Sequence, residues 1–189
     1  MFHIEDKEFI RGKVPMTKQE VRCISIAKLD LKEDSILIDV GAGSGSVGIE
    51  VTNFTPKGKV FGIEVNPDGI EVIKQNLEKF SVTNYELIEG LAPSDIPQIE
   101  VDRMFIGGSK GNLDTILEWF LCHSKEEAKV VINTITLESL GEAMKGLEKL
   151  KFCEIEVINI NIARNKKIGR YNMMMGENPI YIISAKRSK

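Results

Sequence analysis

Short apolar runs alternate with amphipathic segments along most of the chain. Five runs have the near-continuous hydrophobicity of strands buried on both faces, and they span residues 35–40, 59–64, 85–88, 101–106 and 129–133. Segments with helical spacing accompany them at residues 46–54, 67–80, 112–123 and 136–150. This alternation predicts right-handed βαβ units and a mainly parallel sheet with helices on both faces.

The two ends of the chain depart from this alternation. Residues 152–163 and 179–185 are both β-rich with no helical segment between them, so they predict an antiparallel hairpin. Near the start, residues 17–29 predict a helix that opens with a capping box of Thr17 and Glu20. The segment before this helix follows neither period and predicts an irregular arm.

The expected fold is therefore α/β: a doubly wound, Rossmann-like, mainly parallel seven-stranded sheet with an antiparallel C-terminal hairpin, the architecture of class I methyltransferases that use S-adenosylmethionine. The chain has no repeat, low-complexity tract or Pro/Gly-rich linker, which predicts a single domain over residues 1–189. Within it we expect an N-terminal arm and helix at 1–30, cofactor-binding βα units at 35–150 and the hairpin at 151–189.

Composition narrows the classes of partner. The net charge is -3, so the chain lacks the global positive field that recruits nucleic acid. It has no bilayer-length apolar run and no apolar leader at the N-terminus, which argues against a membrane. Three cysteines and two histidines are scattered without metal-like spacing. We expect a cytoplasmic protein with no metal, no nucleic acid and no membrane partner.

The clearest chemical signal is the run from Asp39 to Gly45 after the first strand, DVGAGSG. Glycines at alternate positions (Gly41, Gly43 and Gly45) allow a tight turn and close approach of a ligand, and Ser44 lies among them. A phosphate-binding P-loop would need a lysine after the last glycine, and none is there.

The dinucleotide pattern GxGxxG is met by Gly43, Gly45 and Gly48, but the pattern is weak alone. Asp39 favours a cation over a pyrophosphate, which indicates the ammonium of S-adenosylmethionine. Alternatively, Asp39 is an acid that only organises the loop by bonding local backbone.

A second acid, Glu64, ends the second strand and is expected beside the glycine loop. A carboxylate there can accept both hydroxyls of an adenosine ribose, in S-adenosylmethionine or in NAD. The alternative is a solvated strand-end acid. After the third strand, Leu91 and Ala92 stand where methyltransferases usually carry Gly-Asp-Ala, so they are expected to wall the adenine without a side-chain acceptor.

After the fourth strand, Gly107, Gly108 and Ser109 form a small, flat segment with room for a bulky planar substrate, although a plain strand-to-helix turn would also use glycine. Together these segments resemble the cobalt-precorrin-6B methyltransferase (decarboxylating) family. The resemblance spans nearly the whole chain, and its matching pieces are residues 9–18, 39–47 and 105–109, Asn133, residues 136–138 and residues 178–180.

The resemblance implies methyl transfer from S-adenosylmethionine to carbon 15 of a (cobalt-)precorrin tetrapyrrole, with loss of CO₂ from the acetate on carbon 12, in cobalamin biosynthesis. It also implies a homotetramer and adds Thr17 to the cofactor-binding residues. Because precorrins carry many carboxylates, cations are expected at the substrate, with arginine suited to bidentate contacts. The substrate-site candidates are Arg11, Gly107, Gly108, Ser109, Asn133 and Arg170, and no catalytic acid or base is assigned.

The sequence departs from the family pattern at Leu91 and at Lys110, where a third small residue is expected. Three other functions remain open from the residues alone. The first is a methyltransferase of tRNA or another acceptor, which would show a continuous positive face. The second is an NAD-dependent oxidoreductase, and the third is an adenosine-binding module without catalysis.

Overall fold

A seven-stranded sheet with the order β3-β2-β1-β4-β5-β9-β6 forms the centre of the protein. The computed structural model describes residues 3–188; residues 1, 2 and 189 of the predicted arm and hairpin ranges lie outside the described residues. Its strands are β1 (Ile36–Val40), β2 (Lys59–Glu64), β3 (Tyr85–Glu89), β4 (Val101–Ile106), β5 (Ser124–Thr134), β6 (Cys153–Ile160) and β9 (Ile180–Lys186). Neighbours from β3 to β5 pair in parallel, which confirms the predicted doubly wound sheet.

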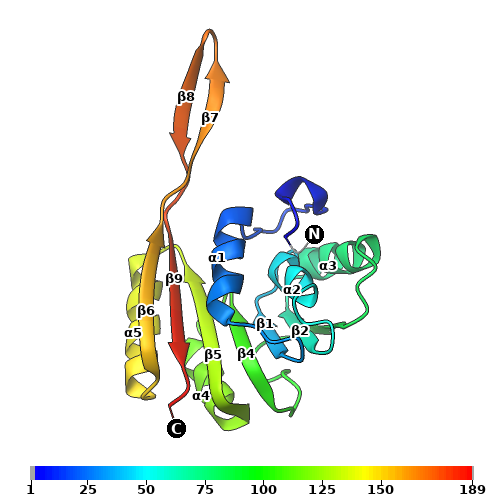
Figure 1. The fold of residues 1–189 in the computed structure, drawn as a ribbon, viewed down its shortest axis with the longest axis vertical. Coiled ribbons are helices and arrows are strands. Elements are labelled where there is room, and N and C mark those ends of the chain that lie inside the picture. The colour runs from blue at the N-terminus through cyan, green and yellow to red at the C-terminus, as the bar shows by residue number, and fades with distance from the viewer. Residues whose placement is uncertain (1–2, 189) are drawn as a thin grey trace.

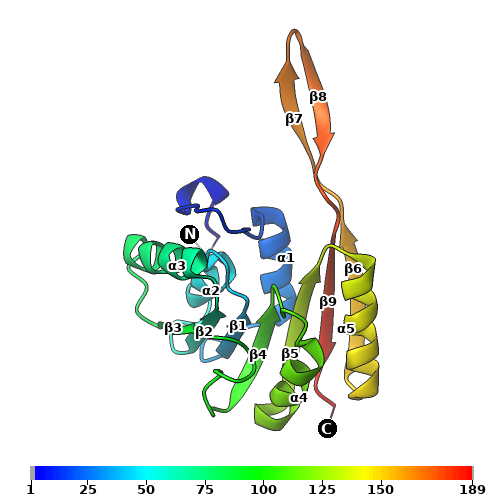
Figure 2. The same cartoon turned by 180° about the vertical axis from the view of Figure 1, so that it is seen from behind.

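The antiparallel closure of the sheet is also confirmed. Strand β9 pairs antiparallel with both β5 and β6, so β9 alone among the seven runs against the others. Between β6 and β9 only a loop was expected from the sequence. The structure instead has a second hairpin, β7 (Ala163–Ile168) and β8 (Tyr171–Gly176), that stands away from the sheet (Figures 1 and 2). Every residue of both strands is exposed, so burial imposes no pattern by which sequence could reveal them.

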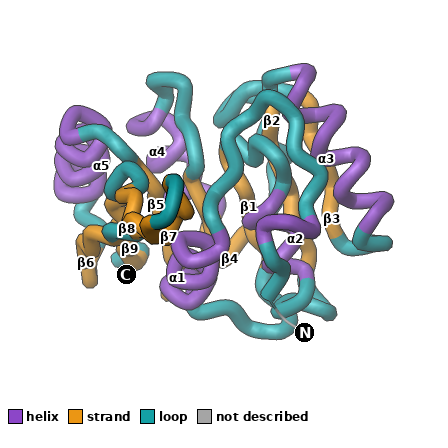
Figure 3. Tube along the Cα trace, turned by 90° about the horizontal axis from the view of Figure 1, so that it is seen from above, coloured by secondary structure: helices purple, strands orange, loops and turns teal. Residues whose placement is uncertain are grey.

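Helices cover both faces of the sheet: α1 and α2 lie on one side, and α4 and α5 on the other (Figure 3). The helices are α1 (Gln19–Leu29), α2 (Ser46–Thr52), α3 (Pro67–Lys79), α4 (Leu113–His123) and α5 (Leu137–Lys149), with a short 3-10 turn at Asp6–Glu8.

The predicted capping box at the start of α1 is wrong. The N-cap residue is Lys18, and no side chain caps this helix end. Instead, the backbone carbonyl of Thr17 accepts a hydrogen bond of 2.7 Å from the buried Arg22 guanidinium. The arm before α1 is irregular, as predicted, apart from the 3-10 turn.

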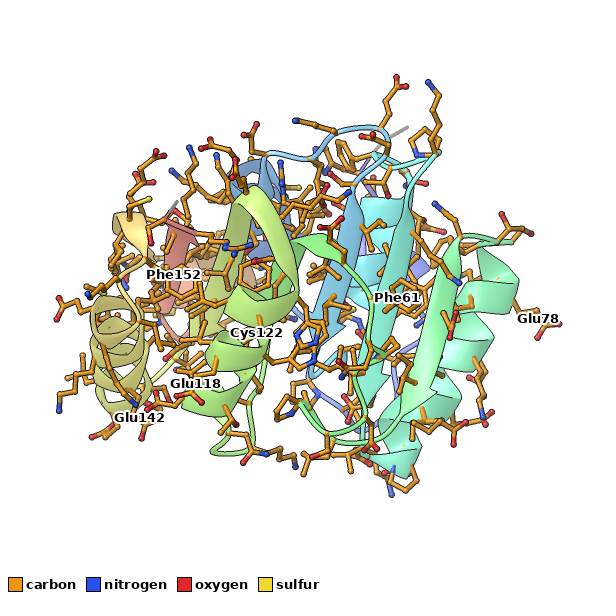
Figure 4. The ribbon with its side chains drawn as sticks, turned by 90° about the horizontal axis from the view of Figure 1, so that it is seen from below. Phe61, Glu78, Glu118, Cys122, Glu142 and Phe152 are labelled. Carbon is orange, nitrogen blue, oxygen red and sulfur yellow. The ribbon has the colours of Figure 1, made fainter. Side chains whose placement is uncertain are left out.

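Two apolar clusters fill the two sides of the sheet. The larger joins the sheet to α4 and α5 and extends from Phe61 on β2 to Phe152 before β6 (Figure 4). The smaller joins the other face to α1 and α2, with Val21, Val47 and Phe105 among its members. These clusters hold the strands rigidly, so the loops at their carboxyl ends have fixed positions. No helix in the described part of the chain is long and apolar enough to cross a membrane.

Candidate functional site

A cavity of about 280 Å³ opens where the loops after β1, β2, β3 and β4 meet. This is the carboxyl edge of the parallel strands, where open α/β sheets bind ligands. Nine of the predicted site residues line it: Thr17, Gly41, Gly43, Glu64, Leu91, Ala92, Gly107, Gly108 and Ser109. We refer to this cavity as the first pocket.

The glycine loop is in tight contact with two other segments. Gly41 has φ 68, and a Cβ there would lie 2.5 Å from the carbonyl oxygen of Gly108. Gly43 has φ 59, and its Cβ would lie 3.0 Å from the carbonyl oxygen of Pro15. The loop after β1 therefore touches both the loop after β4 and the N-terminal arm, and only glycine fits at these approaches.

Asp39 lies behind this loop and does not line the first pocket. Its side chain is buried, and Oδ2 accepts a hydrogen bond of 3.0 Å from the Gly48 amide in the first turn of α2. Its other oxygen, Oδ1, has no hydrogen-bond partner among the described residues. The geometry therefore does not support direct contact with a ligand's ammonium and matches the alternative interpretation, an acid that organises the loop.

Burial raises the pKa of Asp39 to about 7, and the nearby Glu64 carboxylate adds to the rise, while the Gly48 hydrogen bond opposes it. The Tyr85 hydroxyl beside it is also buried without a partner among the described residues. Burial and the same two acids hold the pKa of Tyr85 well above its usual range. A neutral phenol and a partly protonated carboxyl are therefore packed beneath the loop.

Ser44 and Gly45 also lie behind the pocket rather than in its wall. The Ser44 carbonyl accepts a hydrogen bond of 3.0 Å from the buried Asn76 side chain. Gly45, with φ 76, is the N-cap of α2. These two residues therefore connect the loop to α2 and α3 and do not face a ligand in the first pocket.

Glu64 does reach the first pocket, but most of its acceptor capacity is already used. Its Oε2 accepts a hydrogen bond of 2.7 Å from the Gly43 amide. Its Oε1 accepts from the amides of Val65 and Asn66, at 3.0 and 2.8 Å. A carboxylate has about four acceptor positions, so roughly one is left for a ligand. Bidentate acceptance of two ribose hydroxyls would require displacement of one of these amides.

Leu91 and Ala92 wall the first pocket, as expected. The Leu91 amide, however, donates to Asp95 Oδ2 at 2.7 Å, so it is not free for an adenine ring. Asp95 thus supplies a carboxylate to this loop four positions beyond the point where methyltransferases usually carry one.

A second cavity of about 410 Å³ adjoins the first. The two share Pro15, Thr17 and the segment from Gly107 to Ser109, so this segment is a common wall. We refer to the segment from Gly107 to Ser109 as the ledge. A Cβ at Gly108 would meet no atom within 4 Å, so the ledge is open at this position. The cavity continues over Ile106, Leu113 and Ile132 to the hydrophobic side chains of Ile135 and Ile180.

Asn133, a predicted substrate-site residue, lines this second pocket. Its side chain exchanges hydrogen bonds with Ser25 of α1: Asn133 Nδ2 donates at 2.9 Å, and Ser25 Oγ lies 3.1 Å from Asn133 Oδ1. This pair fixes the Asn133 amide at the pocket wall. The charged residues of the wall are Lys18 and Glu142.

The two predicted arginines lie elsewhere. Arg11 is exposed, and its guanidinium bonds the carbonyl of Asp6 at 3.2 Å. Arg170 is at the tip of the β7–β8 hairpin, where it bonds the Tyr171 hydroxyl at 2.7 Å. Neither arginine lines either pocket, and the cations that the described pocket walls contain are Lys110 in the first and Lys18 in the second.

Several wall residues were not predicted as site residues from the sequence: Val14, Pro15, Val65, Asn66 and Phe105 in the first pocket, and Met16, Ser139 and Glu142 in the second. Val65 and Asn66 directly follow Glu64, so their position after a strand was a usable signal. The arm and α5 contribute through tertiary packing, which no local pattern encodes.

Comparison with known proteins agrees with this geometry. A protein of Methanocaldococcus jannaschii, named a probable cobalt-precorrin-6B C(15)-methyltransferase (decarboxylating), is 37% identical over 98% of this chain and 99% of its own. The crystal structure of a precorrin-6y C5,15-methyltransferase from Geobacter metallireducens has a TM-score of 0.89 at 41% identity, covering 97% of both chains.

The structure of a precorrin 8w decarboxylase from Methanobacterium thermoautotrophicum has a TM-score of 0.88 at 33% identity and covers 96% of this chain and 98% of its own. These similarities confirm the predicted class I methyltransferase fold. The family model described as the precorrin methyltransferase domain matches residues 8–187. The chain therefore belongs to the precorrin methyltransferase family.

Proposed function

We propose that this protein methylates carbon 15 of a (cobalt-)precorrin-6B tetrapyrrole with S-adenosylmethionine and removes CO₂ from the acetate on carbon 12, as a step of cobalamin biosynthesis. The observation that carries the proposal is the pair of adjoining pockets that share the ledge from Gly107 to Ser109. One pocket suits a nucleoside and the other a bulky apolar ring system, in a chain of this family.

The residues of the first pocket fit the cofactor. The close approach of Gly41 and Gly43 to neighbouring backbone leaves a loop whose surface carries no side chain. Glu64 keeps one acceptor position for a ribose hydroxyl, and Leu91 and Ala92 give an apolar wall for the adenine. S-adenosylmethionine, when bound, supplies a methyl group activated by its sulfonium.

The chain's own contribution to such a transfer is placement. Both ligands can touch the wall that the pockets share, formed by Pro15, Thr17 and the ledge, so the acceptor carbon has to lie against it. Apolar side chains of the second pocket exclude water from the reacting atoms. Lys18, at the N-cap of α1, offers an ammonium to a carboxylate of the substrate.

The activity is tested by incubating cobalt-precorrin-6B with the purified protein and S-adenosylmethionine. The molecular mass of the product is then measured by mass spectrometry. We expect a tetrapyrrole that has gained one methyl group and lost CO₂. A parallel incubation with cobalt-free precorrin-6B shows whether the metal is required. An unchanged tetrapyrrole, with cofactor binding verified by calorimetry, would contradict the proposed acceptor, and tRNA would then be assayed.

Glu64→Ala is expected to weaken S-adenosylmethionine binding by about tenfold to a hundredfold, because a hydrogen bond to a charged group contributes ~1.5–3 kcal/mol. The matched control is Glu86→Ala on the neighbouring strand, where the carboxylate pairs with exposed Lys59. Isothermal titration calorimetry measures both. Equal affinities for the two variants would remove Glu64 from the cofactor site.

We also propose that the homotetramer forms through the β7–β8 hairpin. Ile168 pairs with Tyr171 in the hairpin, and side chains two positions apart on a strand share a face. Tyr171, Met173 and Met175 therefore lie on one face with Ile168, and all four apolar side chains are exposed. Lys166 and Arg164 lie on the same face, opposite Met173 and Met175. An exposed apolar face of this kind is typical of a surface that another chain covers.

The double variant Met173→Lys, Met175→Lys is expected to dissociate the tetramer, because it would bury two more positive charges beside Lys166 and Arg164. Met174→Lys, on the opposite face of the same strand, is the matched control and should leave the assembly intact. Light scattering after gel filtration gives the mass of each. A monomeric wild-type protein, or a tetrameric double variant, would refute this interface.

A further inference from the structure

A histidine, a cysteine and a glutamate meet on the face of the sheet covered by α1 and α2, away from both pockets. His3 Nδ1 lies 2.7 Å from Glu50 Oε1 and 3.3 Å from Cys23 Sγ. One ligand atom from each of the three residues lies within 4.8 Å of the others. They come from the N-terminal arm, α1 and α2, so their separation in sequence hid them from spacing analysis.

The Glu50 carboxylate is held firmly for such a role. It is fully buried, and its Oε2 accepts hydrogen bonds from Arg22 Nε at 2.8 Å and from the Ile4 amide at 3.0 Å. Both donors hold the same oxygen, which leaves Oε1 directed at His3. Hydrogen bonds of this kind orient a metal ligand and fix its geometry.

We propose that His3, Cys23 and Glu50 form a binding site for a divalent cation of the zinc class. Imidazole, thiolate and carboxylate are the ligand types that Zn²⁺ takes in proteins, and a water molecule would complete a tetrahedron. Bond lengths to zinc of about 2.0–2.3 Å place the ligand atoms of a tetrahedron roughly 3.3–3.6 Å apart. The observed separations of 2.7 and 3.3 Å approach these values, so small side-chain rotations admit the ion.

Charge favours a cation at this place. Asp6 lies beside the group, with Oδ1 3.1 Å from Arg22 Nη1, so two acids face one guanidinium. This excess of negative charge attracts a cation, and a bound cation stabilises the Cys23 thiolate that binds it.

Binding needs no redox partner. The thiol of Cys23 releases one proton as its sulfur takes the metal. The proton that lies between His3 Nδ1 and the carboxylate moves to Nε2 of the same ring, which frees Nδ1 as a ligand. Side chains of His3 and Cys23 are partly accessible, so the ion can enter from solvent.

The site would tether the arm to the helices beneath it. The arm continues from His3 to Pro15 and Thr17, which line both pockets. A cation that joins the arm to α1 and α2 would therefore support the shared pocket wall from outside, without touching a ligand there.

The test is titration of the full-length protein with Co²⁺, followed by the thiolate-to-cobalt charge-transfer absorption. A Cys122→Ser, Cys153→Ser background leaves Cys23 as the sole thiol, because the chain has three cysteines. We expect saturation at one Co²⁺ per chain and displacement by Zn²⁺. In this background His3→Gln should weaken the affinity at least about tenfold, and Cys23→Ser should abolish the absorption band.

The matched control is His123→Gln, since His123 lies on α4 and its ring contacts Gln98 and the Trp119 carbonyl instead. This variant should bind Co²⁺ as the background does. Zinc should also raise the melting temperature of the background protein and leave that of His3→Gln unchanged. Absence of saturable binding would overturn the proposal. An unchanged Co²⁺ affinity in His3→Gln would also overturn it, because Cys23 would then bind the cation without His3.

Discussion

Gly41→Ala is expected to abolish S-adenosylmethionine binding and to lower the melting temperature. The new Cβ would lie 2.5 Å from the carbonyl oxygen and 2.9 Å from the amide nitrogen of Gly108. Both are backbone atoms, so the clash is relieved only if the loops after β1 and β4 separate. The residue also keeps φ 68, which costs a non-glycine residue ~1–2 kcal/mol. Because both loops line the first pocket, its shape cannot survive their separation.

We expect at least about a hundredfold loss of cofactor affinity by calorimetry, or ~3 kcal/mol. Gly141→Ala is the matched control: it adds the same methyl group within α5, where a Cβ meets nothing within 4 Å. This variant should bind S-adenosylmethionine normally and should be slightly more stable, because alanine has a higher helix propensity than glycine. Normal S-adenosylmethionine binding by Gly41→Ala would show that the loops after β1 and β4 can separate without loss of the pocket, and that the pocket does not depend on their contact.

The glycine loop shows where sequence is informative. A buried strand that ends with an acid and is followed by alternate glycines has one common structural solution, so the loop and its position at the sheet edge could be predicted. The orientation of the acid could not. Whether Asp39 faces the ligand or the first turn of α2 depends on side-chain packing, and the hydrogen bond to Gly48 decides it here.

The parts that escaped prediction depend on long-range packing or on exposed positions. The β7–β8 hairpin has no buried face to impose alternation. Pro15 reaches both pockets because the arm crosses the glycine loop, a contact that hydrophobic periodicity does not record. His3, Cys23 and Glu50 likewise meet only because α1 and α2 pack together. Regular elements and strand-end loops were therefore predictable, whereas the contacts between distant segments were not.

Asp39→Asn is expected to remove a strong pH dependence of stability while changing cofactor affinity little. The pKa of Asp39 is raised to about 7 in the folded protein, chiefly by burial, from 3.8 for an unperturbed carboxyl. A raised pKa means that the unfolded chain ionises first as pH rises. The folded state favours the protonated carboxyl, so the free energy of unfolding is highest below pH ~4. It declines between pH ~4 and pH ~7 and is constant above that, with a total loss of ~4 kcal/mol. Asparagine cannot ionise and keeps an oxygen for the Gly48 amide.

Urea unfolding of both proteins between pH ~4 and ~8 measures this, and the difference between them cancels the other titrating groups. The variant should gain stability relative to wild type as pH rises, by up to ~4 kcal/mol. Asp34→Asn, at an exposed acid, should show no such trend. Cofactor affinity should change less than about threefold, because the carboxyl does not line the pocket. A tenfold loss of affinity in a stable variant would instead assign the charge of Asp39 to the cofactor's ammonium, acting across the loop.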